Sequence, residues 1–139
     1  MRNLLFVFVL FGASLAAQTA ARPSDVVADS ALLIGKRVSW TGKQIRVSTT
    51  LLNGQRVTTN RVFALLDAQG KEDRLQIFAV EGNATETQAA QALNTKKDDS
   101  GIRRVAGTIG SVGDIEVYVN GKPATVKGPR LTGATLDAK

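Results

Sequence analysis

The stretch that decides the fold is GKRVSWTGKQIRV, residues 35–47. Val38 and Trp40 alternate with polar residues, and this period of two predicts a half-buried strand. Beyond Gly42 the apolar side chains change to odd positions, beginning with Ile45. One inserted residue produces such a change, so we predict a β-bulge at Gly42. A long first strand that is kinked at a glycine can take part in both halves of a small barrel.

The elements outside this stretch are predicted from periodicity and turn signals. In chain order they are a helix over 24–34, strands over 37–47, 57–66 and 75–80, a helix over 84–93, strands over 102–109 and 115–119, and a last strand region over 124–136. This order predicts a mainly β protein, a five-stranded Greek-key OB-fold barrel with a short N-terminal helix and one helix between strands three and four. The alternative is an α+β fold, in which an antiparallel sheet packs against two helices.

Local signals place several boundaries of these elements. Gly35 is expected to end the first helix, and Asn83 with Glu86 resembles a capping box at the start of the second. Asn53-Gly54 predicts a turn, and Asn120-Gly121 predicts a hairpin turn. The segment 62–66 is apolar on both parities, so both faces of its strand should be covered.

The N-terminal segment has the pattern of an export signal. A basic start at Arg2 is followed by an apolar run over 4–15 and then by small residues up to Ala21. The run is too short to span a bilayer, and it therefore predicts a secretory signal peptide. We expect a signal peptide over 1–21, a single domain over 22–139, no membrane span in the mature chain, and a periplasmic or secreted protein.

Histidine and cysteine are both absent from the sequence. Their absence excludes disulfides, imidazole and thiolate metal ligands, and nucleophilic sites that use histidine as the base. Carboxylates alone can support glycosidase chemistry, but no acid and base pair can be nominated among the 12 acidic residues. We therefore expect a protein that is not an enzyme, with no catalytic residue, no metal and no cofactor.

The balance of charge favours negatively charged partners. Lysine and arginine number 18 against 12 acidic residues, which gives a formal net charge of +6. Such a surface attracts nucleic acid, phospholipid headgroups or acidic glycans. Export would keep the protein away from cytoplasmic nucleic acid, so an anionic ligand or an envelope protein is the favoured partner. The oligomeric state is left open.

OB-folds bind ligands on the face of strands two and three, with aromatic and basic side chains. The candidate ligand-binding residues are Arg61, Arg74, Phe78, Arg104 and Tyr118. Arg103 and Arg104 are adjacent and must point to opposite faces, and Arg103 is expected to leave the core at the strand end. Burial is the alternative for Phe78, and Trp40 is expected in the core.

Three segments resemble the tRNA-anticodon-like OB family, many of whose members are small exported or envelope proteins of unassigned role. They are Gly35 to Gly42, Arg104 to Ile109, and Leu131 to Asp137. The resemblance implies an OB barrel, but it implies neither tRNA binding nor a catalytic residue. The function we expect is a non-enzymatic exported binding module for an anionic ligand or an envelope component. The alternative is a protein-interaction or inhibitor domain that docks a partner through a strand edge or a loop.

Overall fold

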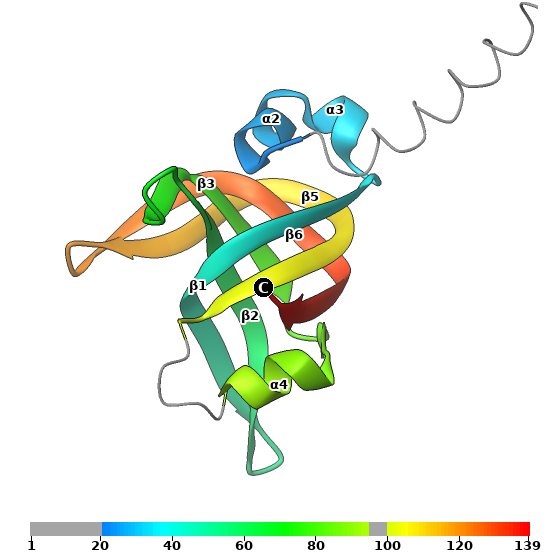
Figure 1. Ribbon diagram of the computed structural model, residues 1–139, viewed down its shortest axis with the longest axis vertical. Coiled ribbons are helices and arrows are strands. Elements are labelled where there is room, and N and C mark those ends of the chain that lie inside the picture. Colours follow the sequence, from blue (N-terminus) through cyan, green and yellow to red (C-terminus); the bar gives the residue numbers. More distant parts are fainter. Residues whose placement is uncertain (1–20, 95–99) are drawn as a thin grey trace, which may run out of the picture.

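Five strands close into a barrel in the computed structural model, which describes residues 21–94 and 100–139 (Figure 1). In chain order the elements are α2 (Pro23–Ala28), α3 (Ser30–Leu33), β1 (Arg37–Leu52), β2 (Gln55–Leu66), β3 (Glu72–Glu81), β4 (Thr85–Glu86), α4 (Gln88–Asn94), β5 (Ile102–Val119) and β6 (Lys122–Ala138). The expected signal peptide lies outside the described residues, apart from Ala21.

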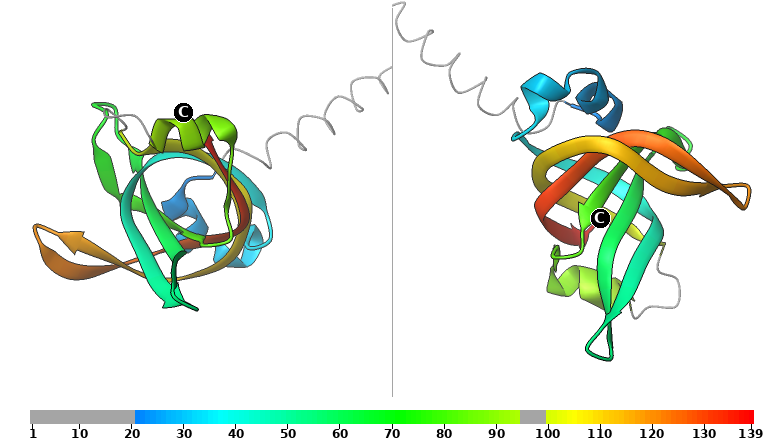
Figure 2. Two further views of the ribbon diagram at one scale, coloured as in Figure 1. Left: turned by 90° about the horizontal axis from the view of Figure 1, so that it is seen from below. Right: turned by 180° about the vertical axis from the view of Figure 1, so that it is seen from behind.

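The strand order is β3-β2-β1-β5-β6, and the first and last of these strands also pair with each other. β3 and β6 run parallel where they meet, with Ala79 opposite Arg130 and Val80 opposite Leu131. This closure and the position of α4 between β3 and β5 match the Greek-key OB-fold, so the predicted fold is confirmed. The α+β alternative, an antiparallel sheet packed against two helices, is wrong, because the sheet closes on itself (Figure 2).

Both predicted helices are present but begin or break at other residues. The first is divided into α2 and α3 because Asp29, at φ −123° and ψ 43°, leaves the helical conformation. The second begins at Gln88, since Thr85 and Glu86 pair with β6 as the short strand β4. The hydroxyl of Thr87 accepts the backbone N–H of Ala90 at 3.3 Å. Thr87 therefore caps α4, and the capping box expected at Asn83 and Glu86 was wrong.

The bulge in β1 lies at Ile45, whereas we predicted it at Gly42. The pairing of β1 with β5 runs without a shift through Gly42 and Lys43, and the shift against β2 falls between Gln44 and Arg46. The change of parity was thus detected correctly, but its position was assigned to the nearest glycine.

A close backbone approach explains why position 42 is glycine. The φ angle of Gly42 is not in the left-handed region, so conformational freedom is not the reason. A Cβ atom there would lie 2.9 Å from the carbonyl oxygen of Ala64 and 3.4 Å from the ring of Phe78. Such a position has no room for a methyl group in a close-packed interior.

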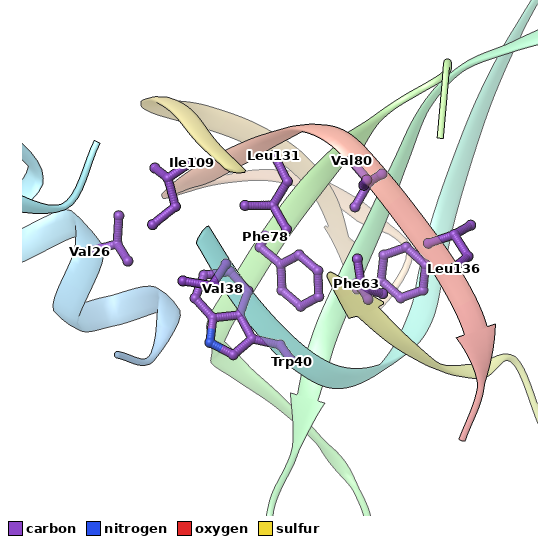
Figure 3. Packing of buried hydrophobic residues seen from close by; sticks show 11 residues of the cluster. Val26, Val38, Trp40, Phe63, Phe78, Val80, Ile109, Leu131 and Leu136 are labelled. Atoms are coloured by element: carbon purple, nitrogen blue, oxygen red, sulfur yellow. The ribbon is translucent and has the colours of Figure 1, made fainter. Parts of the chain in front are cut away.

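Three aromatic rings fill the middle of the barrel (Figure 3). Phe63 and Phe78 stack with centroids 5.5 Å apart, and Trp40 is tilted against Phe78 at 4.9 Å. Aliphatic side chains from every strand of the barrel complete this cluster, and they include Val38, Val80, Ile109, Leu131 and Leu136. Trp40 is therefore a core residue, as predicted.

α2 closes one end of the barrel. Val26 is fully buried in the same cluster, and the Gln76 amide exchanges two hydrogen bonds of 3.0 and 2.9 Å with Ser24. The indole N–H of Trp40 donates to the carbonyl of Ala21 at 2.7 Å. Ala21 therefore contacts the barrel core through its backbone carbonyl.

β5 is one continuous strand over both predicted segments, 102–109 and 115–119. Its second half contributes to a second hydrophobic core, which lies on the outside of the barrel. Residues 112–127, which we call the β5–β6 arm, pack against the outer face of β2 and β3 (Figures 1 and 2). The residues in contact, each at most 1% exposed, are Ile115 and Val117 of the arm with Val62, Ala64, Ile77 and Ala79 of the barrel. The prediction that both faces of the second strand are covered is confirmed.

We expect Gly42→Ala to destabilise the protein by about 1–3 kcal/mol, the usual cost of overpacking a core. Gly113→Ala is the matched control, because a Cβ atom at Gly113 meets nothing within 4 Å. The control should stay within about 0.5 kcal/mol of the parent protein. Urea unfolding measures both variants, and equal stabilities would contradict the close approach at Gly42.

Candidate functional site

The face that usually binds ligands in an OB-fold is not accessible in this protein. Alternation along β2 and β3 places Phe63 and Phe78 inside the barrel, and their neighbours Val62 and Ile77 on the outer face. The arm covers this outer face completely at Val62 and Ile77, which are each 1% exposed. Our expectation that a ligand binds across the face of strands two and three was therefore wrong.

Along one edge of the arm, backbone groups of β5 point away from β6. Tyr118 lies opposite Pro123, which has no N–H, so these two residues form a non-hydrogen-bonded pair. Tyr118 therefore directs its backbone groups away from β6, and Asp114 and Glu116 do the same because they share its parity.

Three arginines from different strands bind these outward carbonyls. The bonds are from Arg46 to the Glu116 carbonyl at 2.9 Å, from Arg74 to the Tyr118 carbonyl at 3.2 Å, and from Arg130 to the Asp114 carbonyl. Hydrogen bonds from charged donors are stronger than neutral ones. The arginines thus hold the edge of the arm against the barrel.

An open polar pocket of about 330 Å³ lies between the β1–β2 hairpin and the arm. Its lining residues are Arg46, Ser48, Asn60, Asp114, Glu116, Thr125 and Arg130. Ser48 and Asn60 face each other across β1 and β2, and Glu116 and Thr125 do so across β5 and β6. The two hairpins that line the pocket correspond to the two loops that bind ligands in OB-folds.

Positive and negative groups are balanced in this pocket. Arg46 Nη1 lies 3.3 Å from Glu116 Oε1, and their side chains are 27% and 65% exposed. Such a solvated pair contributes little to stability. The contacts of Arg46 use Nη1 and that of Arg130 uses Nη2, whereas a guanidinium has five N–H groups. Both side chains therefore keep donors for a ligand.

Tyr118 lies beside the pocket and is 52% exposed. The guanidinium carbon of Arg46 lies 5.4 Å from the centroid of its ring, a cation–π distance. Arg46 therefore connects the pocket, the edge of the arm and the exposed ring.

Arg61, a candidate from the sequence, lies elsewhere. Its Nη2 lies 2.9 Å from Glu86 Oε1, and its Nη1 donates to Gln44 Oε1 at 3.2 Å. The side chains of Arg61 and Glu86 are each 19% exposed. Arg61 thus ties β2 to β1 and β4 and is not presented to an external anion.

Arg104 is exposed on the outer surface of the other half of the barrel, between Thr41 of β1 and Asp137 of β6. The hydroxyl of Thr87, which donates to Asp137 at 2.7 Å, lowers the pKa of that carboxyl, and the charge of Arg104 adds to this effect. Arg103 points to the opposite face, as expected, but it is 5% exposed and donates to the Ile102 carbonyl. The expectation that Arg103 leaves the core was wrong.

Phe78 is 0% exposed and stacks on Phe63, so the expectation that its ring meets a ligand was also wrong. Alternation had identified two faces of its strand without showing which one lies inside. Of the five candidates, the structure brings together Arg74 and Tyr118.

The pocket residues were missed because no local pattern identifies them. Arg46 and Glu116 are 70 positions apart in the sequence, and they meet only because the arm folds back. The one available signal was the pair of Asn-Gly turns, which predicted two hairpins on either side of the pocket.

No protein-family model, no curated protein and no solved structure matches this chain. Within residues 21–94 and 100–139, no helix has the length and apolar character that crossing a membrane requires. The same part of the chain holds no group of three or more acidic side chains placed to bind a metal ion.

We expect Arg46→Gln to loosen the arm, because it removes the bond to the Glu116 carbonyl and the contact with Tyr118. The free energy of unfolding should fall by about 1–2 kcal/mol, and amide hydrogen exchange should accelerate around residues 114–118. Arg37→Gln is the control on the same strand, since Arg37 is exposed and lies outside the pocket. Unchanged exchange in the arm of Arg46→Gln would contradict the role assigned to this arginine.

Proposed function

We propose that the protein is an exported, non-enzymatic binding module, and that its ligand is an acidic glycan of the cell envelope held in the pocket between the β1–β2 hairpin and the arm. The observation that carries this proposal is the mixed lining of the pocket, with two guanidiniums, two carboxylates, hydroxyls and an amide. Export rests on the expected signal peptide. Kinship with the tRNA-anticodon-like OB family is part of the proposal, and the barrel supports it at the level of the fold.

An acidic sugar matches each kind of group in this lining. The guanidiniums of Arg46 and Arg130 suit a carboxylate, sulfate or phosphate, which they can bind through paired N–H donors. Asp114 and Glu116 accept hydrogen bonds from sugar hydroxyls, and the exposed ring of Tyr118 offers an apolar surface beside them. A neutral sugar would offer no anionic group to the N–H donors that Arg46 and Arg130 keep free.

A single nucleic acid strand fits this surface less well. Binding of such strands depends on several exposed rings on which successive bases stack. Among the described residues, Trp40, Phe63 and Phe78 are buried, and Tyr118 is the one exposed ring.

Pairing of a partner strand with an edge of the arm is also disfavoured. Strand addition needs free backbone groups on an edge. Arg46, Arg74 and Arg130 already bind the outward carbonyls of β5, and Pro123 lies on the outer edge of β6 within the arm. Both edges of the arm are therefore protected against pairing.

Binding without catalysis agrees with the surroundings of the two carboxylates. A glycosidase needs a carboxylic acid that an apolar pocket keeps protonated. Asp114 and Glu116 are exposed, and Glu116 also pairs with Arg46. Neither carboxylate therefore lies in the apolar surroundings that such an acid requires.

The test is calorimetric titration of residues 21–139 with trigalacturonic acid and with the neutral sugar maltotriose. Trigalacturonic acid should bind more tightly than maltotriose, and added salt should weaken the binding of trigalacturonic acid. The double variant Ser48→Ala, Asn60→Ala should bind it about tenfold more weakly, because it loses two hydrogen-bonding groups that do not hold the arm.

The control is Ser39→Ala, Thr41→Ala, which changes exposed residues of β1 outside the pocket. It should bind trigalacturonic acid like the parent protein. Equal affinity for the two sugars, or an unchanged affinity of the pocket variant, would contradict the proposal.

A further inference from the structure

The two long hairpins of the protein end in the same pattern of residues. Leu51-Leu52-Asn53-Gly54 and Tyr118-Val119-Asn120-Gly121 each place two apolar residues before an Asn-Gly turn. In both turns the asparagine and the glycine have positive φ angles, at 53° and 80° in the first and 53° and 79° in the second. Both tips project clear of the barrel (Figures 1 and 2).

The apolar side chains at these tips are exposed. The exposed fractions are 64% for Leu51, 58% for Leu52, 52% for Tyr118 and 40% for Val119. Adjacent residues of a strand point to opposite faces, so each tip is apolar on both faces. A flat protein surface could cover one face of such a tip, whereas a medium into which the tip inserts covers both.

The charged residues that directly flank both turns are positive. Across the strands, Leu51 pairs with Arg56 and Val119 pairs with Lys122. The sequence contains no acidic residue between positions 44 and 66 or between positions 117 and 136. These segments complement a surface that is negatively charged.

We propose that the two hairpin tips dock on an anionic phospholipid bilayer, with their apolar residues inserted at the level of the headgroups. Long basic side chains can cover apolar surface while their charges reach the lipid phosphates, and tyrosine is well suited to the membrane interface. One small anchor gives marginal binding, so stable docking uses both tips together with the positive charge. Docking by the leucines of the β1–β2 tip does not require the pocket to bind a glycan, because Leu51 and Leu52 lie outside its lining.

Vesicle co-sedimentation tests this proposal. Residues 21–139 are used, because they contain both core clusters and all strands of the barrel, and because the apolar run at 4–15 would itself bind lipid. The protein should sediment with phosphatidylcholine vesicles that contain phosphatidylglycerol, and much less with phosphatidylcholine alone. Arg56→Gln should weaken only the binding to the anionic vesicles.

The double variant Leu51→Ser, Leu52→Ser should reduce partitioning into the anionic vesicles at least tenfold, since it removes two leucines from the inserted tip. Leu32→Ser is the matched control, because Leu32 is 73% exposed on α3 and should change partitioning less than twofold. Thermal unfolding of each variant should show that these exposed substitutions leave the barrel folded.

Three results would overturn the proposal. The first is the absence of binding to anionic vesicles at low salt. The second is equal partitioning of the tip variant and the parent protein, which would indicate adsorption by charge alone. The third is a different binding pattern, in which neither the parent protein nor the tip variant binds vesicles, but the parent protein binds an envelope protein that the tip variant does not bind. This pattern would assign the tips to a protein partner.

Discussion

The contact between the β5–β6 arm and the outer face of β2 and β3 is the constraint on which the rest of the structure depends. Val62 and Ile77 are apolar on a face that would meet water in a bare barrel, and Ile115 and Val117 cover them. Burial of such side chains contributes about 1.5–3 kcal/mol each. The arm therefore follows from the composition of β2 and β3, and it determines where a ligand can bind.

The close contact of the arm with the barrel imposes its own requirements on the chain. At Gly128, where β6 passes from the arm into the barrel, a Cβ atom would lie 2.5 Å from the Ile77 carbonyl oxygen and 2.9 Å from Ile115. Glycine is needed there because two backbones meet. The edge of the arm presents backbone carbonyls to the barrel, and the three arginines bind them.

Much of the fold could be predicted from the sequence, because it depends on local periodicity. The long first strand, the helix between strands three and four and the two Asn-Gly hairpins follow from spacing and turn chemistry. The arm could not be foreseen. We expected two strands over 102–109 and 115–119, whereas β5 is one strand that continues through both.

The candidate site was harder to predict, because it depends on contacts between distant residues. Parity placed Tyr118 on the exposed side correctly, and it separated Arg103 from Arg104. It could not tell that the face of Phe78 is the inner one, or that Arg61 ties β2 to β1 and β4. Arg46 acquires its role from an arm that begins more than 60 positions later in the chain.

Methyl NMR tests the packing of the arm most directly. Cross-peaks should connect the methyl groups of Val62 and Ile77 with those of Ile115 and Val117, because all four side chains belong to one buried cluster. The amides of the arm that pair with β6 should also exchange slowly. Absence of these cross-peaks together with fast exchange in the arm would mean that the outer face of β2 and β3 is free. The ligand would then have the usual OB-fold surface available, and the assignment of the pocket would be contradicted.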